Sequence, residues 1–472
     1  MKNVCLVGVG PHAKRIYIQY FKKYNLVPKL IIELESKKDS TIKYLESQGI
    51  DGYKIFTIND KYKDKKKLNK RISERLKSIC LELNITHAFI STEPKAHYSY
   101  LEFFITNKID VLSDKPITVS TNMMSLRNIK AIKTDYEYLQ NLAKENHVNC
   151  QIMCQRTLHK GYMFIKQLLS EVVSCYHIPV TFIEIFHSDG KWMMPHDLEC
   201  ENHPYKYGYG KLFHSGYHFI QLLTDFVKIN DLIKDESKLI TNCGIKSTFF
   251  TPDDELAVIN FNDYKSLFKD QKVPSFYNCQ LQEFRNFGEK NNYSLLTFRN
   301  KDYCTITVAE LNLLQNSFSR RAWIETKQDE YKGNGRIRHE YVNIEVGPLM
   351  NIQVHSYQSK EICDRTENEY DFGGLEHFDI DIYRNKGLIG GKEYERIRLK
   401  DLYEHDENKS KGYNEKARED FITLFLENKT NICSIESHKL AIDILEQLCL
   451  SLREYNLKNE TTNKNFIIGG EN

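Results

Sequence analysis

The pattern of hydrophobic and polar positions changes near residue 150 and divides the chain into two regions. Before this point, short apolar runs at residues 4–7, 28–35, 83–92 and 109–116 alternate with segments whose apolar residues recur at helical spacing. Strands that alternate with helices are typical of a parallel sheet covered by helices. We therefore predict an α/β domain over residues 1–150.

After residue 150 the apolar residues mostly alternate with polar ones, as they do in half-buried strands. Such alternating or β-branched runs with few helices between them favour a large, mainly antiparallel sheet. The runs are VTFIEIFHS, LITNCGIKSTFF, ELAVINFN, YSLLTFRN, YCTITVAEL, AWIETKQDE, HEYVNIEV and FDIDIYRN. We predict an α+β domain over residues 151–460, with an insertion near 325–375 and two final helices that can pack back on the first domain.

Composition agrees with two folded domains, because 472 residues exceed what one ordinary core accommodates. A hydrophobic share of 41% and a charged share of 28% are typical of globular proteins. The net charge of +2 provides no general attraction to nucleic acid or to an anionic membrane. Residues 61–77 hold nine basic and two acidic residues, but they almost lack the interleaved aromatic residues of a nucleic-acid surface. We interpret this segment as a solvent-exposed helix and predict no nucleic-acid partner.

The cysteines and the N-terminus bear on location. The twelve cysteines are scattered without a CxxC pair, which favours reduced thiols over a disulfide framework. The sequence begins directly with an apolar strand, and no apolar run approaches the roughly 20 residues of a membrane span. We expect a cytoplasmic protein without a membrane partner.

A glycine-containing turn directly follows the first predicted strand and opens a helix. The segment GVGPHA has the form G-x-G-x-x-A. Glycines at such a turn let backbone N–H groups approach a pyrophosphate at a helix N-terminus. The pattern predicts a dinucleotide site that contains Gly8, Gly10, Pro11, His12 and Ala13.

A carboxylate near the end of the second strand supports this interpretation. Glu33 and Glu35 are both candidates, and Glu35 stands at the strand end, where it can accept hydrogen bonds from ribose hydroxyls. An acid at this place repels a 2′-phosphate, so the sequence favours NAD over NADP. Lys37 and Lys38 lie close enough to leave NADP open.

Three further segments, in order along the chain, resemble the glucose–fructose oxidoreductase and inositol dehydrogenase family (Gfo/Idh/MocA). In STEPKAHYSYLEFFITNKIDVLSDKP, Thr92 and His97 match the family's spacing, Pro94 is displaced by one position, and Asp114-Lys115-Pro116 stands in place of Glu-Lys-Pro. MCQRTLHKGYMFIKQLL resembles the strand and helix with which the family enters its second domain. GYGKLFHSGYHFIQLL, residues 208–223, follows the family frame G-G-G-x-L-x-D-x-x-x-H-x-x-D, with Tyr209 in place of the middle glycine and Gln221 in place of the final aspartate.

The resemblance implies a Rossmann domain that binds a nicotinamide dinucleotide and a second domain whose open sheet holds a sugar, cyclitol or sugar derivative. It implies hydride transfer to or from a hydroxyl or carbonyl group. Lys115 would supply charge beside the hydroxyl and His218 would act as the base. The dinucleotide would also contact Thr92, Pro94, His97 and Asp114. The free face of the sheet implies a homodimer or homotetramer.

One position departs from the family pattern in a chemically important way. The family's aspartate is replaced by His214, which is not reliably anionic and, as an imidazolium, would repel Lys115. His214 is therefore an unusual third catalytic candidate that can contact an acidic group of the substrate. The alternative is a non-catalytic regulator that binds the dinucleotide and senses a ligand without turnover.

His214 and His218 stand four residues apart, which is also the spacing of a zinc-binding pair on a helix. The segment between them lacks the adjacent glutamate of such sites, and no nearby cysteine completes a ligand set. We predict no metal; two polar residues satisfied at a helix–sheet junction are a further alternative. In the preceding loop, Trp192 is a candidate to stack on a sugar, and Arg156 is a candidate for substrate contact. In the same loop as Trp192, further candidates to stack on a sugar are Tyr205 and Tyr207, and candidates to hydrogen-bond its hydroxyls are His187, Asp189 and Lys191.

Overall fold

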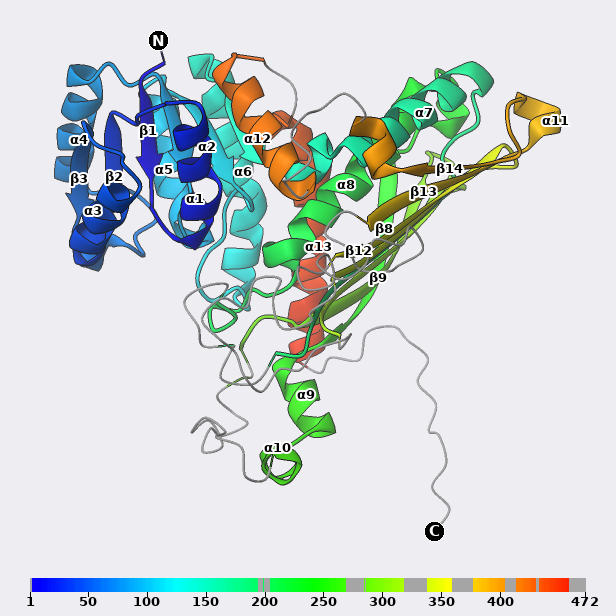
Figure 1. Cartoon of the computed structure of the whole chain (residues 1–472). Helices are drawn as coiled ribbons and strands as arrows, with labels where there is room; N and C mark the ends of the chain where they lie inside the picture. Colours follow the sequence, from blue (N-terminus) through cyan, green and yellow to red (C-terminus); the bar gives the residue numbers. More distant parts are fainter. Residues whose placement is uncertain are drawn as a thin grey trace.

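The computed structural model describes residues 2–193, 198, 204–268, 284, 286–317, 338–358, 377–403, 413–429 and 433–457. Two β-sheets lie at opposite sides of the molecule, and helices from both halves of the chain fill the space between them (Figure 1). No helix within the described ranges has both the length and the apolar character needed to cross a bilayer.

The first sheet has the order β3-β2-β1-β4-β5-β6, and all its described pairings are parallel. Its strands are β1 (Val4–Val7), β2 (Leu30–Leu34), β3 (Lys54–Ile58), β4 (His87–Ile90), β5 (Asp110–Asp114) and β6 (Cys150–Met153). Its helices are α1 (Pro11–Arg15), α2 (Tyr17–Lys23), α3 (Lys38–Ser47), α4 (Lys70–Glu82), α5 (Pro94–Thr106) and α6 (Leu126–Asn146). β1, β4 and β6 are buried along their whole length because helices cover both faces. This strand order is that of a Rossmann fold and confirms the predicted α/β class.

The second sheet has the order β14-β13-β12-β11-β7-β10-β9-β8 and is antiparallel apart from the parallel pair of β7 and β10. The strands are β7 (Phe182–Lys191), β8 (Asn242–Phe250), β9 (Asn291–Arg299), β10 (Thr305–Asn316), β11 (Arg338–Val346), β12 (Met350–Gln358), β13 (His377–Arg384) and β14 (Tyr394–Arg398). The short helix α11 (Lys386–Ile389) joins the last two. The predicted mainly antiparallel sheet is confirmed.

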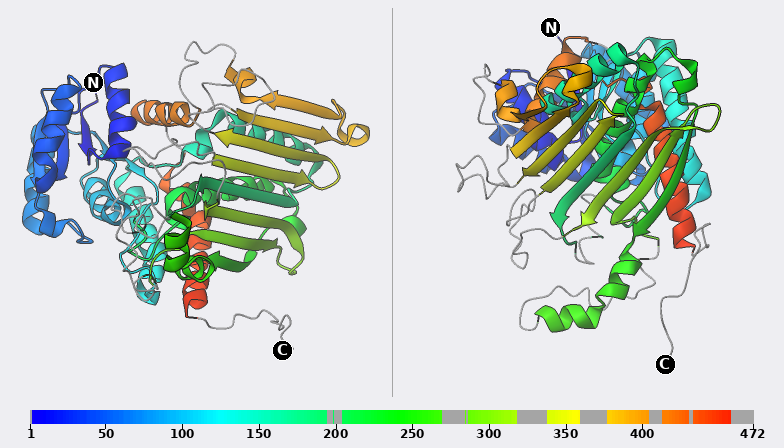
Figure 2. Two further views of the ribbon diagram at one scale, coloured as in Figure 1. Left: turned by 60° about the horizontal axis from the view of Figure 1, so that its bottom comes forward. Right: turned by 90° about the vertical axis from the view of Figure 1, so that its right-hand side faces the viewer.

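Burial alternates strictly along the middle strands of this sheet. On β11 and β12, every second side chain is buried and those between are half-exposed. The buried face packs against α7 (Lys160–Tyr176), α8 (Tyr217–Val227) and α13 (Lys439–Asn456), which lie behind the sheet in Figure 2. The other face carries the half-exposed side chains.

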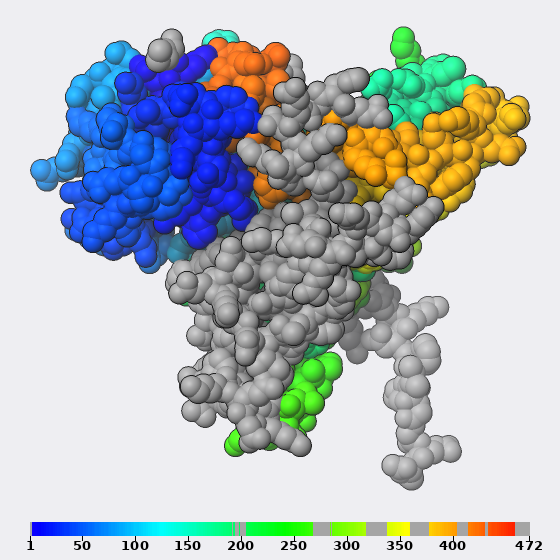
Figure 3. All heavy atoms as spheres, viewed as in Figure 1, coloured from blue at the N-terminus to red at the C-terminus, as the bar shows by residue number. Residues whose placement is uncertain are grey.

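The C-terminal helices return to the first domain. α12 (Tyr413–Leu426) packs on α2, where the Tyr20 hydroxyl lies 2.9 Å from the Thr423 hydroxyl and Lys23 pairs with Glu419. In the space-filling view, α12 (orange) lies directly against the blue N-terminal domain (Figure 3). α13 reaches α6 through Lys133 and Asp443, whose charged atoms are 2.6 Å apart.

Several predicted elements need correction. ELAVINFN forms no strand: α9 (Pro252–Val258) and α10 (Phe261–Phe268) occupy this region. Thr251 caps α9 in a reciprocal pair of hydrogen bonds with Asp254, and this helix-start signal overrides the β-branched pattern. β3, β12 and β14 were not predicted. Within the insertion expected at 325–375, residues 338–358 form the hairpin of β11 and β12. The rest of the insertion and all of AWIETKQDE lie outside the described residues.

Candidate active site

The glycine turn after β1 is built for close backbone approach. Gly8 has a φ of +81° and donates its N–H to the Ile32 carbonyl at 2.9 Å. A Cβ at Gly8 would lie 2.6 Å from the carbonyl oxygen of Ser91. Gly10 then caps α1, whose first residue is Pro11, and Ala13 packs into the core. The turn therefore requires glycine at position 8 and keeps its outer side free of side-chain bulk.

Acidic side chains gather at the carboxyl end of β2. Glu33 accepts hydrogen bonds from the N–H groups of Val9 at 2.9 Å and Leu34 at 2.8 Å, which places it against the glycine turn. Glu35 lies beyond the strand, is exposed, and accepts from the Asn59 side chain at 2.6 Å. Sequence analysis preferred Glu35, whereas Glu33 is the carboxylate that touches the turn.

Asp114, at the end of β5, ties the glycine turn to the neighbouring strands. It accepts hydrogen bonds from Tyr17 at 2.8 Å and Ser91 at 2.7 Å, and the Nδ1 atom of His12 lies 2.9 Å away. Burial opposes ionisation of Asp114, but His12 and the two hydroxyl donors outweigh it and hold the pKa of this carboxyl well below its usual range. Asp114 is thus a fixed negative charge beside Lys115.

His97 holds together the two turns that border Lys115. Its Nδ1 atom lies 2.7 Å from the Pro116 carbonyl oxygen and its Nε2 atom lies 3.1 Å from the Thr92 carbonyl oxygen. The side chain has no exposed surface, and burial lowers its pKa. Pro94 begins α5 between these contacts. His97 therefore positions the backbone at Thr92 and Pro116, and its own ring is enclosed by that backbone.

Lys115 reaches from the first domain to the second. Its ammonium donates to the carbonyl oxygens of Phe213, at 3.4 Å, and His214, in the π-helical turn η5 (Leu212–Gly216). The side chain lies deep at the junction but keeps part of its surface exposed. Burial lowers the pKa of Lys115 to about 8. A lysine that loses its proton near neutral pH, at a junction of two domains, is suited to proton transfer.

His218 lies on α8 near Lys115. It keeps 8% of its surface exposed, and neither ring nitrogen forms a hydrogen bond with the part of the chain that the structure describes. Burial, followed by the charges of Lys115, Arg418 and Arg156, lowers the pKa of His218 well below its usual value. The imidazole is therefore uncharged and has a nitrogen available to accept a hydrogen bond.

His214 occupies a different environment from His218. Its ring packs against Tyr205 and Tyr209, with centroid separations of 5.0 Å and 5.7 Å. The backbone carbonyl of His214 is the group that meets Lys115. Among the described residues, no group of three His, Cys, Asp or Glu side chains is arranged to hold a metal ion, at this pair or elsewhere.

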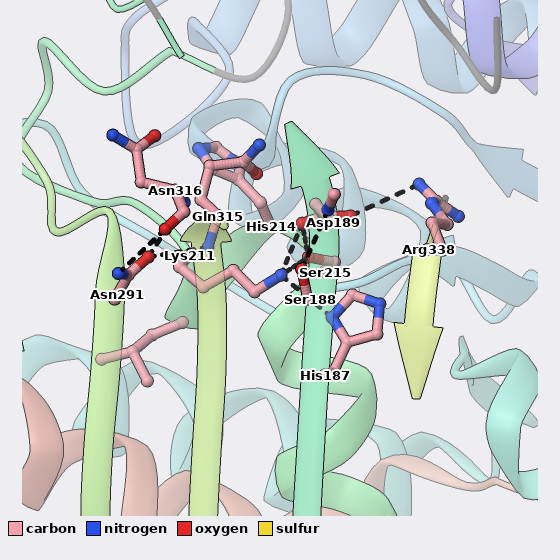
Figure 4. Close-up of polar contacts among 12 residues, drawn as sticks. His187, Ser188, Asp189, Lys211, His214, Ser215, Asn291, Gln315, Asn316 and Arg338 are labelled. Atoms are coloured by element: carbon pink, nitrogen blue, oxygen red, sulfur yellow. Dashed lines mark hydrogen bonds and ion pairs between the residues drawn. The ribbon is translucent and has the colours of Figure 1, made fainter. Parts of the chain in front are cut away.

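A second lysine, Lys211, stands directly before the turn η5 and lies among polar side chains (Figure 4). Lys211, with no exposed surface, donates to Asp189 at 2.5 Å, to Ser215 at 2.8 Å and to Nδ1 of His187 at 3.0 Å. Ser215 also donates to Asp189, at 2.7 Å, and Arg338 lies 3.6 Å from the other oxygen of this carboxylate. Because an ammonium has only donors, His187 carries its proton on Nε2. Sequence analysis missed Lys211, whose position is the variable one in the glycine-rich frame.

Arg156 lies at the same junction but is tightly held. Its guanidinium donates to Asn414 at 2.8 Å and to Glu340, and it lies 5.1 Å from the centroid of the Phe219 ring. The hydroxyl of Tyr162 donates to the other oxygen of Glu340. Arg156 therefore links β11, α8 and α12.

Trp192 lies apart from these groups. Its indole N–H donates to the Tyr264 hydroxyl at 2.8 Å, and it packs against a small apolar cluster that includes Tyr205. Because Tyr205 packs in turn on His214, Trp192 is separated from the turn η5 by one aromatic layer. The structure thus brings together Lys115, His218, Arg156 and the backbone of His214, and places Trp192 behind them.

Glu289 supports the turn η5 and had no sequence signal. It has no exposed surface, and its Oε1 atom accepts from the Leu212 N–H at 2.6 Å. The backbone is equally close, since a Cβ at Gly210 would lie 2.0 Å from the Glu289 carbonyl oxygen. Burial raises the pKa of Glu289 to about 7.

Comparisons with known proteins show which solved structures share this fold. No protein-family model and no curated protein matches the sequence. Solved structures that match include UDP-N-acetylglucosamine 3-dehydrogenase GnnA from Acidithiobacillus ferrooxidans (TM-score 0.53, 10% identity, 96% of this chain and 99% of that chain). An aldose–aldose oxidoreductase from Caulobacter crescentus also matches, with a TM-score of 0.52 and 12% identity over 96% of this chain and 98% of that chain. GenD2 from gentamicin A biosynthesis, in complex with NAD, matches with a TM-score of 0.54 and 10% identity over 96% of this chain and 94% of that chain. Over nearly its whole length, the chain is therefore similar in fold to two-domain oxidoreductases.

Proposed function

We propose that this protein is an NAD(P)-dependent oxidoreductase that moves a hydride to or from a hydroxyl or carbonyl group of a sugar, cyclitol or sugar derivative. The observation that carries the proposal is Lys115, whose pKa of about 8 and place between the two sheets suit proton exchange with a substrate. Proteins of similar fold are a sugar-nucleotide dehydrogenase and an aldose oxidoreductase by name.

The residues at the carboxyl end of the first sheet fit a dinucleotide. A Cβ at Gly8 would collide with the Ser91 carbonyl, so glycine keeps the turn tight, whereas a Cβ at Gly10 would project into open space that a pyrophosphate can occupy. Glu33 or Glu35 can accept hydrogen bonds from ribose hydroxyls. Asp60 adds a third carboxylate, held by the hydroxyl and N–H of Ser36. Three acids repel a 2′-phosphate, which supports NAD over NADP. The bound cofactor would supply the hydride acceptor or donor.

In alcohol oxidation, the protein must position the hydroxyl and remove its proton as the hydride leaves. The uncharged His218 donates its one ring N–H to the hydroxyl oxygen and orients it, which leaves the hydroxyl proton directed at Lys115. These roles reverse the sequence-based expectation, in which His218 is the base. The deprotonated fraction of Lys115 takes the proton, and the carbonyl oxygens of Phe213 and His214 then stabilise the ammonium. In the reverse direction Lys115 returns the proton to the forming alcohol. Asp114 supplies a fixed negative charge that favours this ammonium.

The substitution of the family aspartate is compatible with this scheme. Lys115 contacts the backbone at position 214, so a histidine there leaves this contact in place. We therefore infer an active enzyme rather than a regulator that binds the cofactor without turnover. We further infer that the half-exposed face of the second sheet joins two copies of the chain. The nine described cysteines are all free, which fits the reducing cytoplasm that we propose as its location.

The test is NADH formation or consumption, followed by absorbance, with a panel of sugars, cyclitols and their keto forms. Turnover of at least one compound is expected, together with tighter binding of NAD than of NADP. Tight NAD binding without turnover of any compound would instead favour the regulator. His214→Asp is the accompanying variant: retained activity within about tenfold is expected, because Lys115 is held by the backbone of this residue. Complete loss would show that the imidazole itself is needed.

A further inference from the structure

Arg418 is a buried arginine with little to neutralise it. It lies on α12 with 5% of its surface exposed. Its one described ion pair is with Glu415, one turn earlier on the same helix, at 3.4 Å. Its Nε atom has no hydrogen-bond partner within the described ranges. A buried guanidinium with so few partners is costly unless a further group neutralises it.

The contacts of α12 direct Arg418 toward the junction. Asn414, four residues earlier and thus on the same helix face, bonds to Arg156. On the other side, Glu419 and Thr423 fasten the helix to α2. The charge of Arg418 acts on side chains of both domains: it lowers the pKa of His218, after burial and Lys115, and it adds to the lowering of the pKa of Lys115 that burial causes.

The carboxylates around this junction are already engaged by other groups. Asp114 accepts hydrogen bonds from Tyr17 and Ser91. Glu340 accepts from Arg156 and Tyr162. Asp189 accepts from Lys211 and Ser215. Lys115 is bonded to carbonyl oxygens rather than to a carboxylate. Among the described side chains, Glu415 pairs with Arg418 at 3.4 Å, and Asp114 beside Lys115 is already bonded to other groups. The positive charge of Lys115 and Arg418 is therefore only partly offset at the junction.

We propose that the substrate is an anionic sugar, a sugar acid or sugar phosphate, whose negative group binds Arg418 while its reacting hydroxyl lies at Lys115 and His218. This inference rests on the proposed oxidoreductase function and narrows its substrate class. A guanidinium matches a carboxylate or phosphate with two parallel hydrogen bonds, which gives orientation as well as affinity. Arg418 would then decide which hydroxyl of the sugar faces Lys115.

Calorimetry on the NADH-bound full chain tests this with three probes: D-glucose, D-glucuronate and D-glucose 6-phosphate. We expect at least one anionic probe to bind about tenfold or more tightly than glucose, since a charge-assisted pair contributes on this scale. Tighter binding of D-glucuronate would identify a carboxylate as the recognised group, and tighter binding of D-glucose 6-phosphate would identify a phosphate. Equal or weaker binding of both anions, or no binding by either, would overturn the inference, and this comparison depends on no variant.

Arg418→Gln should then abolish the preference for the anion while NADH affinity stays unchanged. Arg418→Lys should retain part of the preference for the anion, because the positive charge remains while the two parallel donors of the guanidinium are lost. Arg71→Gln, on the exposed surface of α4, removes the same charge elsewhere and should leave the preference intact. A preference that survives Arg418→Gln would refute the role of Arg418. Turnover of neutral sugars without any preference would refute this inference alone, whereas failure to bind NADH would refute the proposed function.

Discussion

Lys211 and Lys115 both donate hydrogen bonds to residues of the same π-helical turn, yet their surroundings differ. Lys211 is bonded to a carboxylate, a hydroxyl and an imidazole nitrogen. Lys115 is bonded to two carbonyl oxygens, and burial has moved its pKa close to neutrality. A buried lysine with a bonded carboxylate holds structure in place, whereas one without it becomes a group that can exchange a proton.

Replacing Lys115 should have the largest effect. Lys115→Met is expected to lower turnover by about 10³-fold, because general acid–base catalysis is lost, with little change in the free energy of unfolding. Lys115→Arg, which keeps the charge but cannot release a proton near neutral pH, should be almost as inactive. In the wild type, the rate of alcohol oxidation should rise with pH and level off above about 8, the pKa of Lys115. A pH-independent rate would contradict this role.

Lys211→Met should lower the stability of the protein more than its turnover, the reverse of Lys115→Met. We expect the free energy of unfolding, measured with denaturant, to fall by about 3 kcal/mol, because buried Asp189 loses the cation bonded to it and, among the described side chains, keeps the more distant Arg338 at 3.6 Å. Lys211→Met combined with Asp189→Asn should recover part of this loss, since the buried charge is then removed. If Lys211→Met leaves stability unchanged and reduces only turnover, the two lysines do not differ as proposed.

Glu289 extends the comparison to a buried acid at the same turn. Its pKa is about 7 instead of 4.5, so the folded state keeps a proton that the unfolded state releases. Stability therefore falls as pH rises from 4.5 to 7, and the cost persists above this window. Glu289→Gln should raise the free energy of unfolding by about 2 kcal/mol at about pH 8 and hardly change it at about pH 4.

Glu255 provides the matched control, because it is buried and paired with Lys290, and it also accepts from Tyr264 at 2.6 Å. Glu255→Gln should destabilise the protein at every pH at which Lys290 is charged. If Glu289→Gln and Glu255→Gln changed the free energy of unfolding in the same way at each pH, pairing with a lysine would not explain the difference between the two buried acids.

Sequence patterns were most informative where structure is local. The strand–glycine–helix signal of β1 and α1 needs only adjacent residues, and Lys115 and His218 stand in recognisable motifs. The apolar pattern predicted a strand at ELAVINFN, but the capping box at Thr251 starts a helix there. It also missed β14, a half-exposed strand at the sheet edge whose apolar residues do not clearly alternate with polar ones. Arg418 carries no local signal, because its role arises only when α12 folds back on α2.

The return of α12 also sets an order of assembly during synthesis. The six parallel strands are complete once residue 153 has been made, and domains generally fold as units from the N-terminus. The glycine turn and its acidic neighbours can thus form early, while Arg156 has to wait for Asn414, 258 residues later. Under the proposed function, the nascent chain would therefore be able to hold a dinucleotide long before it could act on a second molecule, and chemistry would be the last property that it acquires.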